Sequence, residues 1–277
     1  MNEAPFAPSI VEDALDIVHE ADRRGISVRI FGSIGVYLHC QGLISEYRKS
    51  KRSFGDIDVA APLVQVHAVS ECLLSLGYEE ETTYRILTGG GRRRYLHVNR
   101  GTSVDLALDA LRFCQTLDLR RRLQADYPTL SVTDLLLSKI QKMDLEPKDR
   151  FDVWALLDEH EIGGSDEETV NLGYIAALCS RSWRWWRCLR ANVTVLLRDQ
   201  SQPGGGKANL IAKLREIQEG VEVAPKSLVW RLRSIAGDSI SWSRHVEQVV
   251  AAQPRSDKSE SSLQDDLGSR PCKSSSG

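Results

Sequence analysis

The sequence lacks the features that mark membrane proteins, secretory proteins and proteins held together by disulfides or zinc. No window approaches the roughly eighteen uninterrupted apolar residues that a membrane helix needs, and residues 1–10 show no basic cluster followed by an apolar stretch. None of the six cysteines forms a Cys-x-x-Cys pair, so the spacing of a zinc ribbon or a redox dithiol is missing. We therefore expect a cytoplasmic protein with no membrane partner and with buried free thiols, except for Cys272 in a polar tail.

An excess of either charge is also missing. The chain has 36 basic and 38 acidic residues and a formal net charge of −2, which argues against a surface that binds nucleic acid everywhere, although local basic patches remain compatible with it. The six histidines show no His-x-x-x-His or His-Cys spacing, so the sequence assigns none of them to a metal, and no hydrolase triad is visible. With 42% hydrophobic residues, the chain is expected to fold around a core.

The apolar pattern divides the chain into a mixed first half and a helical second half. It predicts a helix over Ile10–Arg24 that ends at Gly25, a strand over Val28–Phe31, a turn at Gly32-Ser33 and a helix over Ile34–Cys40. It then predicts a strand around Ile57 and Val59, a helix over Val64–Leu76, a hairpin of Tyr84–Leu87 with Tyr95–Val98, and a strand over Ser103–Leu108. Helices are predicted over Thr133–Met143, Lys148–Glu159, Val170–Leu197 and Asn209–Gln218, and around Trp230 and Val246.

Two aspartates flank an isoleucine at Asp56-Ile57-Asp58, at the start of an apolar strand. Alternate residues of a strand point to the same face, about 6 to 7 Å apart along the chain, so both carboxylates are expected on one side. Mg²⁺ prefers hard oxygen ligands and usually takes one or two carboxylates together with phosphate oxygens. An isolated Asp-x-Asp is more often a solvated strand edge, so the interpretation depends on neighbouring motifs.

The neighbouring motif is the turn Gly32-Ser33 between a strand and a helix. Glycine permits close approach of the backbone to a phosphate, and a serine hydroxyl can donate a hydrogen bond to it. The first turn of the following helix offers free backbone N–H groups and the positive end of the helix dipole. The turn and the two aspartates together indicate a site for a triphosphate beside a divalent cation.

A third acidic residue, Asp105, lies within the apolar strand Ser103–Leu108, where an unpaired charge is costly to bury. In nucleotidyl transfer such a carboxylate accepts the proton of the attacking hydroxyl or helps to hold the metal. A salt-bridged structural aspartate is one alternative. Asp109, on the same face if the strand continues, is a competing candidate, and we favour Asp105.

These motifs resemble those of a known family. Phe31-Gly32-Ser33, Asp56-Ile57-Asp58-Val59 and the later apolar-Asp-apolar strand together resemble the signature of the DNA polymerase β-like nucleotidyltransferase superfamily. The segments that begin at Asp134 and Lys148 are similar to the helical end of its minimal AbiEii-like branch, which includes toxins of toxin–antitoxin systems and many uncharacterised bacterial proteins. The resemblance covers roughly Ile10–Leu157, and the remaining helical part resembles an extension of actinobacterial members.

The resemblance implies an α+β class, with a nucleotidyltransferase-fold mixed β-sheet, flanking helices and an all-α C-terminal region. We expect a catalytic domain over residues 1–160, a helical domain over 161–252 and a disordered tail over 253–277, where Ser, Asp and Lys dominate. The implied catalytic and metal-binding residues are Asp56, Asp58 and Asp105, with Mg²⁺ or Mn²⁺ as cofactor. The implied nucleotide-binding residues are Gly32, Ser33 and Lys139, with a nucleoside triphosphate (NTP) as substrate.

The expected activity is transfer of a nucleoside monophosphate from an NTP to a hydroxyl or phosphate of an acceptor. RNA, a protein and a small molecule are the candidate acceptors, and a toxin-like role would add an antitoxin as partner. The alternative is a catalytically inactive nucleotide-binding or partner-binding protein that retains the fold.

Several basic and aromatic features stay open at this level. Lys139 either contacts a phosphate or pairs with Asp149. The inserted basic segment Arg48–Arg52 is either a lid over the phosphates or a solvated loop, the latter being favoured, and Arg92–Arg94 are expected to be exposed. The cluster Trp183, Trp185 and Trp186 invites a nucleic-acid interpretation, yet the helical spacing of Leu178, Trp185, Cys188, Leu189 and Val193 favours a buried stripe.

Overall fold

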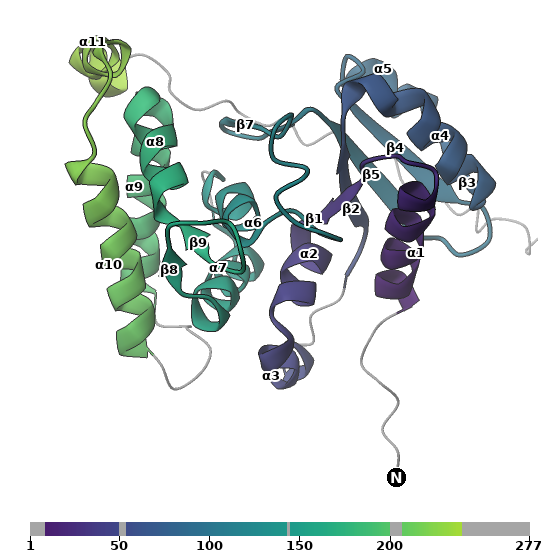
Figure 1. Cartoon of the computed structure of the whole chain (residues 1–277), viewed down its shortest axis with the longest axis horizontal. Coiled ribbons are helices and arrows are strands. Elements are labelled where there is room, and N and C mark those ends of the chain that lie inside the picture. Colours follow the sequence, from purple (N-terminus) through teal and green to yellow (C-terminus); the bar gives the residue numbers. More distant parts are fainter. Residues whose placement is uncertain (1–8, 50–53, 143–144, 200–206, 240–277) are drawn as a thin grey trace, which may run out of the picture. The chain divides into compact units, whose positions relative to one another are not determined.

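A computed structural model describes residues 9–49, 54–142, 145–199 and 207–239 (Figure 1). Several predictions fall partly or wholly outside these ranges: the end of the helix Thr133–Met143, the helix around Val246, the linker Ser201–Lys207, the disordered tail and the exposure of Cys272. Most of the basic segment Arg48–Arg52 is also outside them. The described residues belong to one compact unit.

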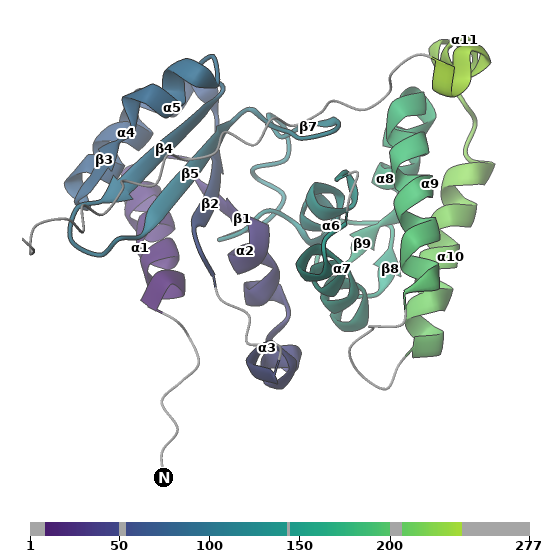
Figure 2. The ribbon, with the colours of Figure 1, turned by 180° about the vertical axis from the view of Figure 1, so that it is seen from behind.

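A five-stranded mixed sheet forms the centre of the first half (Figures 1 and 2). Its strand order is β1 (Arg29–Phe31), β2 (Ile57–Ala61), β5 (Ser103–Leu108), β4 (Arg92–His97) and β3 (Tyr78–Glu80). β2 and β5 run parallel, and the three other neighbouring pairs are antiparallel. The expectation of an α+β protein with a mixed sheet and flanking helices is confirmed.

Helix α1 (Ser9–Arg23) shows how the apolar pattern positions the elements around the sheet. Its buried residues include the predicted set Ile10, Ala14, Ile17, Val18 and Ala21. Gly25 follows at φ 71°, a left-handed conformation that suits the residue after a helix end. α1 contacts α4 (Val66–Ser75) and the strands β1 and β2. α2 (Gly32–His39) also contacts β1 and β2.

The predicted strand Tyr84–Leu87 is wrong, because these residues belong to helix α5 (Thr82–Leu87). A short apolar run carries no decisive periodicity, and here only Tyr84 is buried whereas Ile86 and Leu87 are exposed. The partner of β4 on this side is β3, which the sequence interpretation missed.

No element was predicted for the polar stretch directly after Cys40, but the structure has two there. It forms a 3₁₀ turn, η1 (Gln41–Leu43), and helix α3 (Ile44–Lys49). Tyr47 is fully buried there, with ring centroids 5.3 Å from Tyr37 and 4.9 Å from Phe151. This aromatic contact explains why a segment of polar composition packs against the core.

The second half is helical, as predicted, with a small addition. Its helices are α6 (Val132–Ile140), α7 (Pro147–Glu159), α8 (Leu172–Arg181), α9 (Trp183–Arg198), α10 (Lys207–Val223) and α11 (Leu228–Ala236). Helices α8, α9 and α10 lie side by side (Figures 1 and 2). Two pairs of short strands were not predicted. They are β8 (Ile162–Gly163) with β9 (Val170–Asn171), and the hairpin of β6 (Ala110–Arg112) with β7 (Thr116–Asp118), which precedes α6.

The single helix expected over Val170–Leu197 is interrupted at Ser182. This residue has extended backbone angles, and its hydroxyl accepts a hydrogen bond from the Trp185 backbone N–H at 3.3 Å, so it caps a new helix. The predicted stripe is otherwise confirmed, since Trp185, Cys188, Leu189 and Val193 are buried. Packing is therefore the role of this side of α9.

Polar contacts join α9 and α10 to α6 and α7. The Asn192 amide donates to the Lys142 carbonyl at 2.6 Å, and the Cys188 thiol donates to the Gln141 carbonyl at 3.2 Å. The buried Lys213 ammonium donates to the Leu157 and His160 carbonyls at 3.0 Å each, which satisfies the end of α7. The domain boundary at residue 160 stays a prediction.

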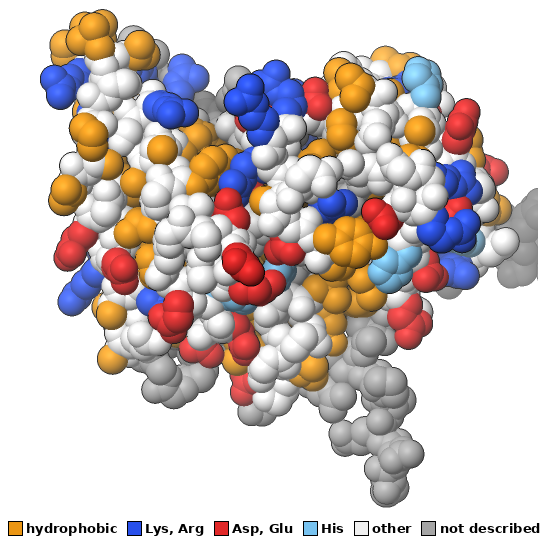
Figure 3. All heavy atoms as spheres, in the orientation of Figure 1, with side chains coloured by type: hydrophobic (Ala, Val, Ile, Leu, Met, Phe, Trp, Pro, Cys, Tyr) orange, Lys and Arg blue, Asp and Glu red, His pale blue; other side chains and the backbone are white. Residues whose placement is uncertain are grey.

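The thiols, the lengths of the helices and the apolar surface can be described for the residues that the structure covers. Cys40, Cys72, Cys114, Cys179 and Cys188 are buried free thiols, as predicted. Among the described residues, no helix combines the length and the apolar character needed to cross a bilayer. Leu228, Val229, Leu232 and Ile235 of α11 are exposed, and Figure 3 shows hydrophobic side chains gathered over this helix.

Candidate active site

The parallel pairing of β2 and β5 brings two predicted site residues together. Asp58 and Asp105 are register partners, so their carboxylates lie on the same face of the sheet. Asp56 directly precedes β2 and lies two residues before Asp58, and its charge acts on the Asp58 carboxyl. The three acids named from the sequence are therefore gathered at one place on the sheet.

Gly32 lies directly against this acidic cluster. Its φ is 69°, and a Cβ placed on it would be 2.0 Å from Asp58 Oδ2. Because real Cβ atoms do not approach this closely, the position requires glycine both for its conformation and for space. Ser33 follows in the first turn of α2, whose N-cap residue Phe31 makes no side-chain capping bond. The free N–H groups of this turn therefore adjoin the carboxylates.

The Asp58 carboxyl has a pKa raised to about 7, first because it is desolvated and then because Asp56 and Asp105 repel its charge. Lys139 and Arg92 act in the opposite direction. A carboxyl whose ionisation is opposed by two like charges indicates a site that favours a cation.

This shift predicts how stability depends on pH. Folding raises the pKa of Asp58, so between about pH 4 and 7 the folded protein holds a proton that the unfolded chain has released, and stability falls as pH rises through 7. Each pKa unit is worth about 1.4 kcal/mol. Allowing for partial solvent exposure, we expect Asp58→Asn to raise the free energy of unfolding at pH 8 by about 2 kcal/mol relative to wild type, and by far less at pH 4.

Urea denaturation at both pH values, with a chelator present, measures this difference. Asp16→Asn, at an exposed position of α1, is the matched control and should give the same small difference at both pH values. If Asp58→Asn raised the free energy of unfolding by the same amount at both pH values, the electrostatic explanation would be contradicted.

Two arginines of β4 hold the third acid, so the salt bridge given as the alternative for Asp105 is present, although the sequence interpretation did not identify its partners. Arg94 Nε donates to Asp105 Oδ1 at 2.7 Å and Arg94 Nη2 to Asp105 Oδ2 at 3.0 Å, a bidentate pair, while Arg92 Nη2 reaches Oδ2 at 3.4 Å. The Arg94 guanidinium also lies over the Tyr84 ring at 4.6 Å. The expectation that Arg92–Arg94 are simply exposed is wrong, because β4 pairs with β5 and turns alternate side chains toward Asp105.

Asp109 and Lys139 take part in other contacts. Asp109 lies beyond the end of β5, where Oδ1 accepts a hydrogen bond from the Leu63 backbone N–H at 2.9 Å. Lys139 is buried in α6, with Nζ 2.8 Å from Asp152 Oδ2 and 3.8 Å from Asp149 Oδ1. The ion-pair interpretation of Lys139 is thus realised, mainly with Asp152, and its contact with a phosphate stays a prediction.

Comparisons with known proteins show a likeness to solved structures and none to a family model or a curated sequence. No family model matches the chain, and no curated protein matches its sequence. Among solved structures, the chain is similar to the solution structure of the antibiotic-resistance factor ANT(2'')-Ia, with a TM-score of 0.39 and 11% sequence identity. The match covers 62% of this chain and 94% of that chain.

Proposed function

We propose that the protein is a metal-dependent nucleotidyltransferase. In this proposal Asp56, Asp58 and Asp105 hold Mg²⁺ or Mn²⁺, and Gly32, Ser33 and Lys139 bind the nucleoside triphosphate. The observation that carries it is the in-register placement of Asp58 and Asp105 on parallel strands, with Gly32 closing on Asp58. Hard carboxylate oxygens in this number fit Mg²⁺, which takes few protein ligands and keeps phosphate oxygens for the rest.

The chain's own groups have distinct tasks in this reaction. A bound divalent cation supplies neutralisation of the triphosphate and of the charge that develops on it. The N–H groups of the first turn of α2 and the Ser33 hydroxyl orient the phosphates. The acceptor oxygen bonds to the α-phosphorus while the bond to the leaving pyrophosphate breaks, and Asp105 either accepts the acceptor's proton or helps to hold the cation.

One observation favours the second candidate, a protein that binds a nucleotide or a partner without transfer. Arg94 engages both oxygens of Asp105 and Arg92 also reaches Oδ2, so guanidinium groups already compensate the charge of this carboxylate and compete with a metal ion for it. If the Arg94 guanidinium stays in place, it substitutes for a metal cation, and the protein keeps the fold without catalysing nucleotidyl transfer.

A transfer assay separates the two candidates. Purified protein is incubated with each of the four labelled NTPs, Mg²⁺ and acceptors of the three classes, and nucleotide binding is measured in parallel. The enzyme proposal expects Mg²⁺-dependent transfer that falls about 100-fold or more in Asp56→Asn/Asp58→Asn, with Asp16→Asn unchanged. Binding of Mg²⁺-NTP without transfer would support the silent alternative, and neither binding nor transfer would remove both.

Arg94→Met tests the role of the bidentate contact between Arg94 and Asp105. If the protein is an enzyme in which the guanidinium yields to the cation, the variant binds Mg²⁺ more tightly than wild type, because Asp105 loses its bidentate partner and keeps only the longer contact with Arg92. If Arg94 permanently replaces the cation, the variant gains Mg²⁺ binding that wild type lacks. The partly exposed Arg85 of α5, which pairs with Glu80, is changed to methionine as the control.

A toxin-like role with an antitoxin partner, and RNA as acceptor, are finer proposals that rest on the family resemblance alone. Growth arrest on expression, relieved by Asp56→Asn/Asp58→Asn, would support chemistry as its cause. Arrest that persists in this variant would point to binding by the fold.

A further inference from the structure

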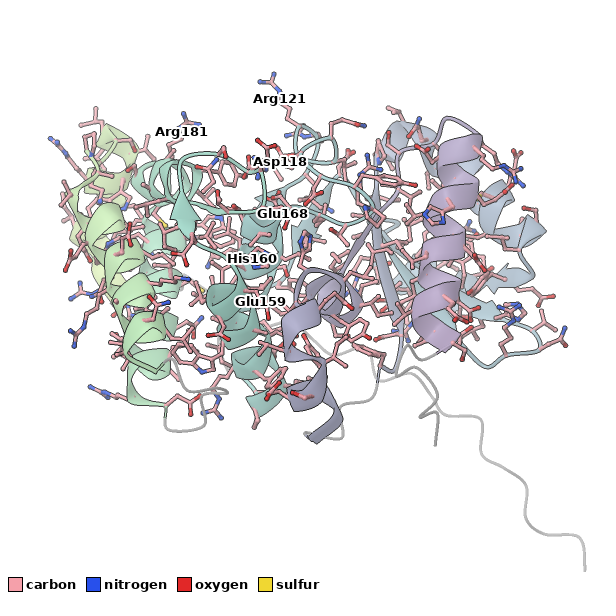
Figure 4. All side chains as sticks on the ribbon, turned by 60° about the horizontal axis from the view of Figure 1, so that its bottom comes forward. Asp118, Arg121, Glu159, His160, Glu168 and Arg181 are labelled. Carbon is pink, nitrogen blue, oxygen red and sulfur yellow. The ribbon has the colours of Figure 1, made fainter. Side chains whose placement is uncertain are left out.

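Two histidines and a glutamate from distant parts of the sequence meet at the far end of α2 from Gly32. His39 is the last residue of α2, His160 follows the end of α7, and Glu168 lies in the segment between β8 and β9. One ligand atom from each lies within 4.8 Å of the other two. Figure 4 shows His160 and Glu168 next to each other at the junction of α7 with this segment.

The spacing of the three side chains matches a shared ion. Glu168 Oε2 is 3.4 Å from His39 Nδ1 and also 3.4 Å from His160 Nε2. Bonds of about 2.0 to 2.1 Å in a tetrahedral zinc site place neighbouring ligand atoms about 3.3 Å apart. Two of the three edges therefore already have the length that a tetrahedral cation requires.

The outer nitrogen of each ring is held by a second partner, as it is in metal sites. His160 Nδ1 lies 3.0 Å from the Leu156 carbonyl, an acceptor, so this nitrogen carries a proton and Nε2 is the nitrogen that faces Glu168. His39 Nε2 lies 2.6 Å from Thr129 Oγ1 and 3.4 Å from Asp126 Oδ2. With its proton on that side, His39 presents the Nδ1 lone pair toward the same Glu168 oxygen, backed by a carboxylate.

A second carboxylate lies beside the cluster. Asp126 Oδ2 is buried, has no hydrogen-bond partner among the described residues and lies 3.4 Å from His39 Nε2. Two carboxylates and two imidazole rings from separate segments of the chain form a donor set that suits a divalent cation.

We propose that His39 Nδ1, His160 Nε2 and Glu168 Oε2 bind a divalent ion of the zinc class, with water as the remaining ligand. Imidazole nitrogen selects Zn²⁺ and its neighbours over Mg²⁺, so this site differs in chemistry from the acidic cluster at Gly32. The ion ties the end of α2 to the end of α7 and to the segment that carries Glu168. The inference does not rest on the proposed nucleotidyltransferase activity.

Metal analysis of the untagged full chain tests this site. The protein is loaded with ZnCl₂ in the presence of excess MgCl₂, dialysed and analysed for bound zinc, and CoCl₂ is added to the metal-free protein to record the visible spectrum of the bound ion. We expect one equivalent of zinc and a tetrahedral cobalt spectrum in wild type. His39→Ala, His160→Ala and Glu168→Gln should each weaken binding about 10- to 100-fold or more.

Two controls and a stability measurement keep the test decisive. His67→Ala, at an exposed position of α4, and Asp56→Asn/Asp58→Asn should both retain the equivalent of zinc. Zinc should raise the unfolding temperature of wild type and of both controls but not of Glu168→Gln, whose exposed side chain is not needed for folding. No bound zinc in wild type, retention in His39→Ala, or loss only in the aspartate variant would overturn the proposal.

Discussion

Replacing Arg122 by alanine is expected to lower the free energy of unfolding by about 3 to 5 kcal/mol, because it leaves a buried carboxylate without its cation. Asp134, at the start of α6, has no exposed surface, and both of its oxygens accept from Arg122 Nε, at 3.1 and 2.9 Å. The same guanidinium donates to both Asp166 oxygens at 2.6 and 2.7 Å. It also lies over the Tyr174 ring of α8 at 4.1 Å. One side chain thus joins three segments of the chain.

The loss in Arg122→Ala should depend on pH. Burial already raises the pKa of Asp134 to about 6, and removing the guanidinium raises it further. An acid whose pKa is raised by folding stabilises the folded state less as pH rises. The free energy of unfolding that the variant loses relative to wild type should therefore be larger at pH 8 than at pH 5. The double variant Arg122→Ala/Asp134→Asn removes the uncompensated charge and should recover part of the loss.

The adjacent residue Arg121 provides the control for this prediction. Its side chain is exposed and projects away from the protein in Figure 4, so Arg121→Ala should change the free energy of unfolding by no more than about 0.5 kcal/mol. Urea denaturation of the three variants measures the comparison. Equal effects at positions 121 and 122 would show that the buried network contributes nothing beyond an exposed arginine.

Local patterns were enough to predict the elements that carry the acidic site. The strand Ser103–Leu108 was predicted with its observed bounds, because Val104 precedes Asp105, the apolar run Leu106–Leu108 follows it, and Gly101 lies before the strand. Asp58 and Asp105 meet because each lies in a strand of this type and the two strands pair in parallel. Their catalytic role is still a prediction.

Contacts between distant segments could not be predicted in the same way. The pairing of Arg94 with Asp105 depends on the register of β4 against β5, which no local spacing encodes. His39 and His160 are far apart in the sequence and match no metal-binding motif. The sequence interpretation assigned no histidine to a metal because it considered only ligands that are close in the sequence. Ser182 carries a local signal for the start of a helix, because serine before a helical run is a preferred N-cap. A single helix was predicted instead, because the apolar residues on both sides of Ser182 follow one helical spacing.

Gly32→Ala is expected to abolish binding of Mg²⁺ and nucleotide and to lower the free energy of unfolding by more than the same change at Gly25. Gly32 and Gly25 have nearly the same φ, 69° and 71°, so both alanine variants carry the left-handed penalty of about 1 to 2 kcal/mol. Of the two, Gly32 has a neighbour in the way, whereas no atom of the described residues lies within 4 Å of a Cβ at Gly25. The difference between the two variants isolates the contact with Asp58.

A double-mutant cycle attributes this difference to the carboxylate itself. In Gly32→Ala the new methyl group displaces Asp58 from its place beside Asp105, whereas Asp58→Ala removes the two closest atoms, Oδ2 at 2.0 Å and Cγ at 2.8 Å. The combined variant should therefore be more stable than the sum of the single effects predicts, by about 1 to 3 kcal/mol. Additive effects would mean that the backbone conformation, and not the approach to Asp58, requires glycine at position 32. Nucleotide binding that survives in Gly32→Ala would mean that the close contact with Asp58 does not shape the site.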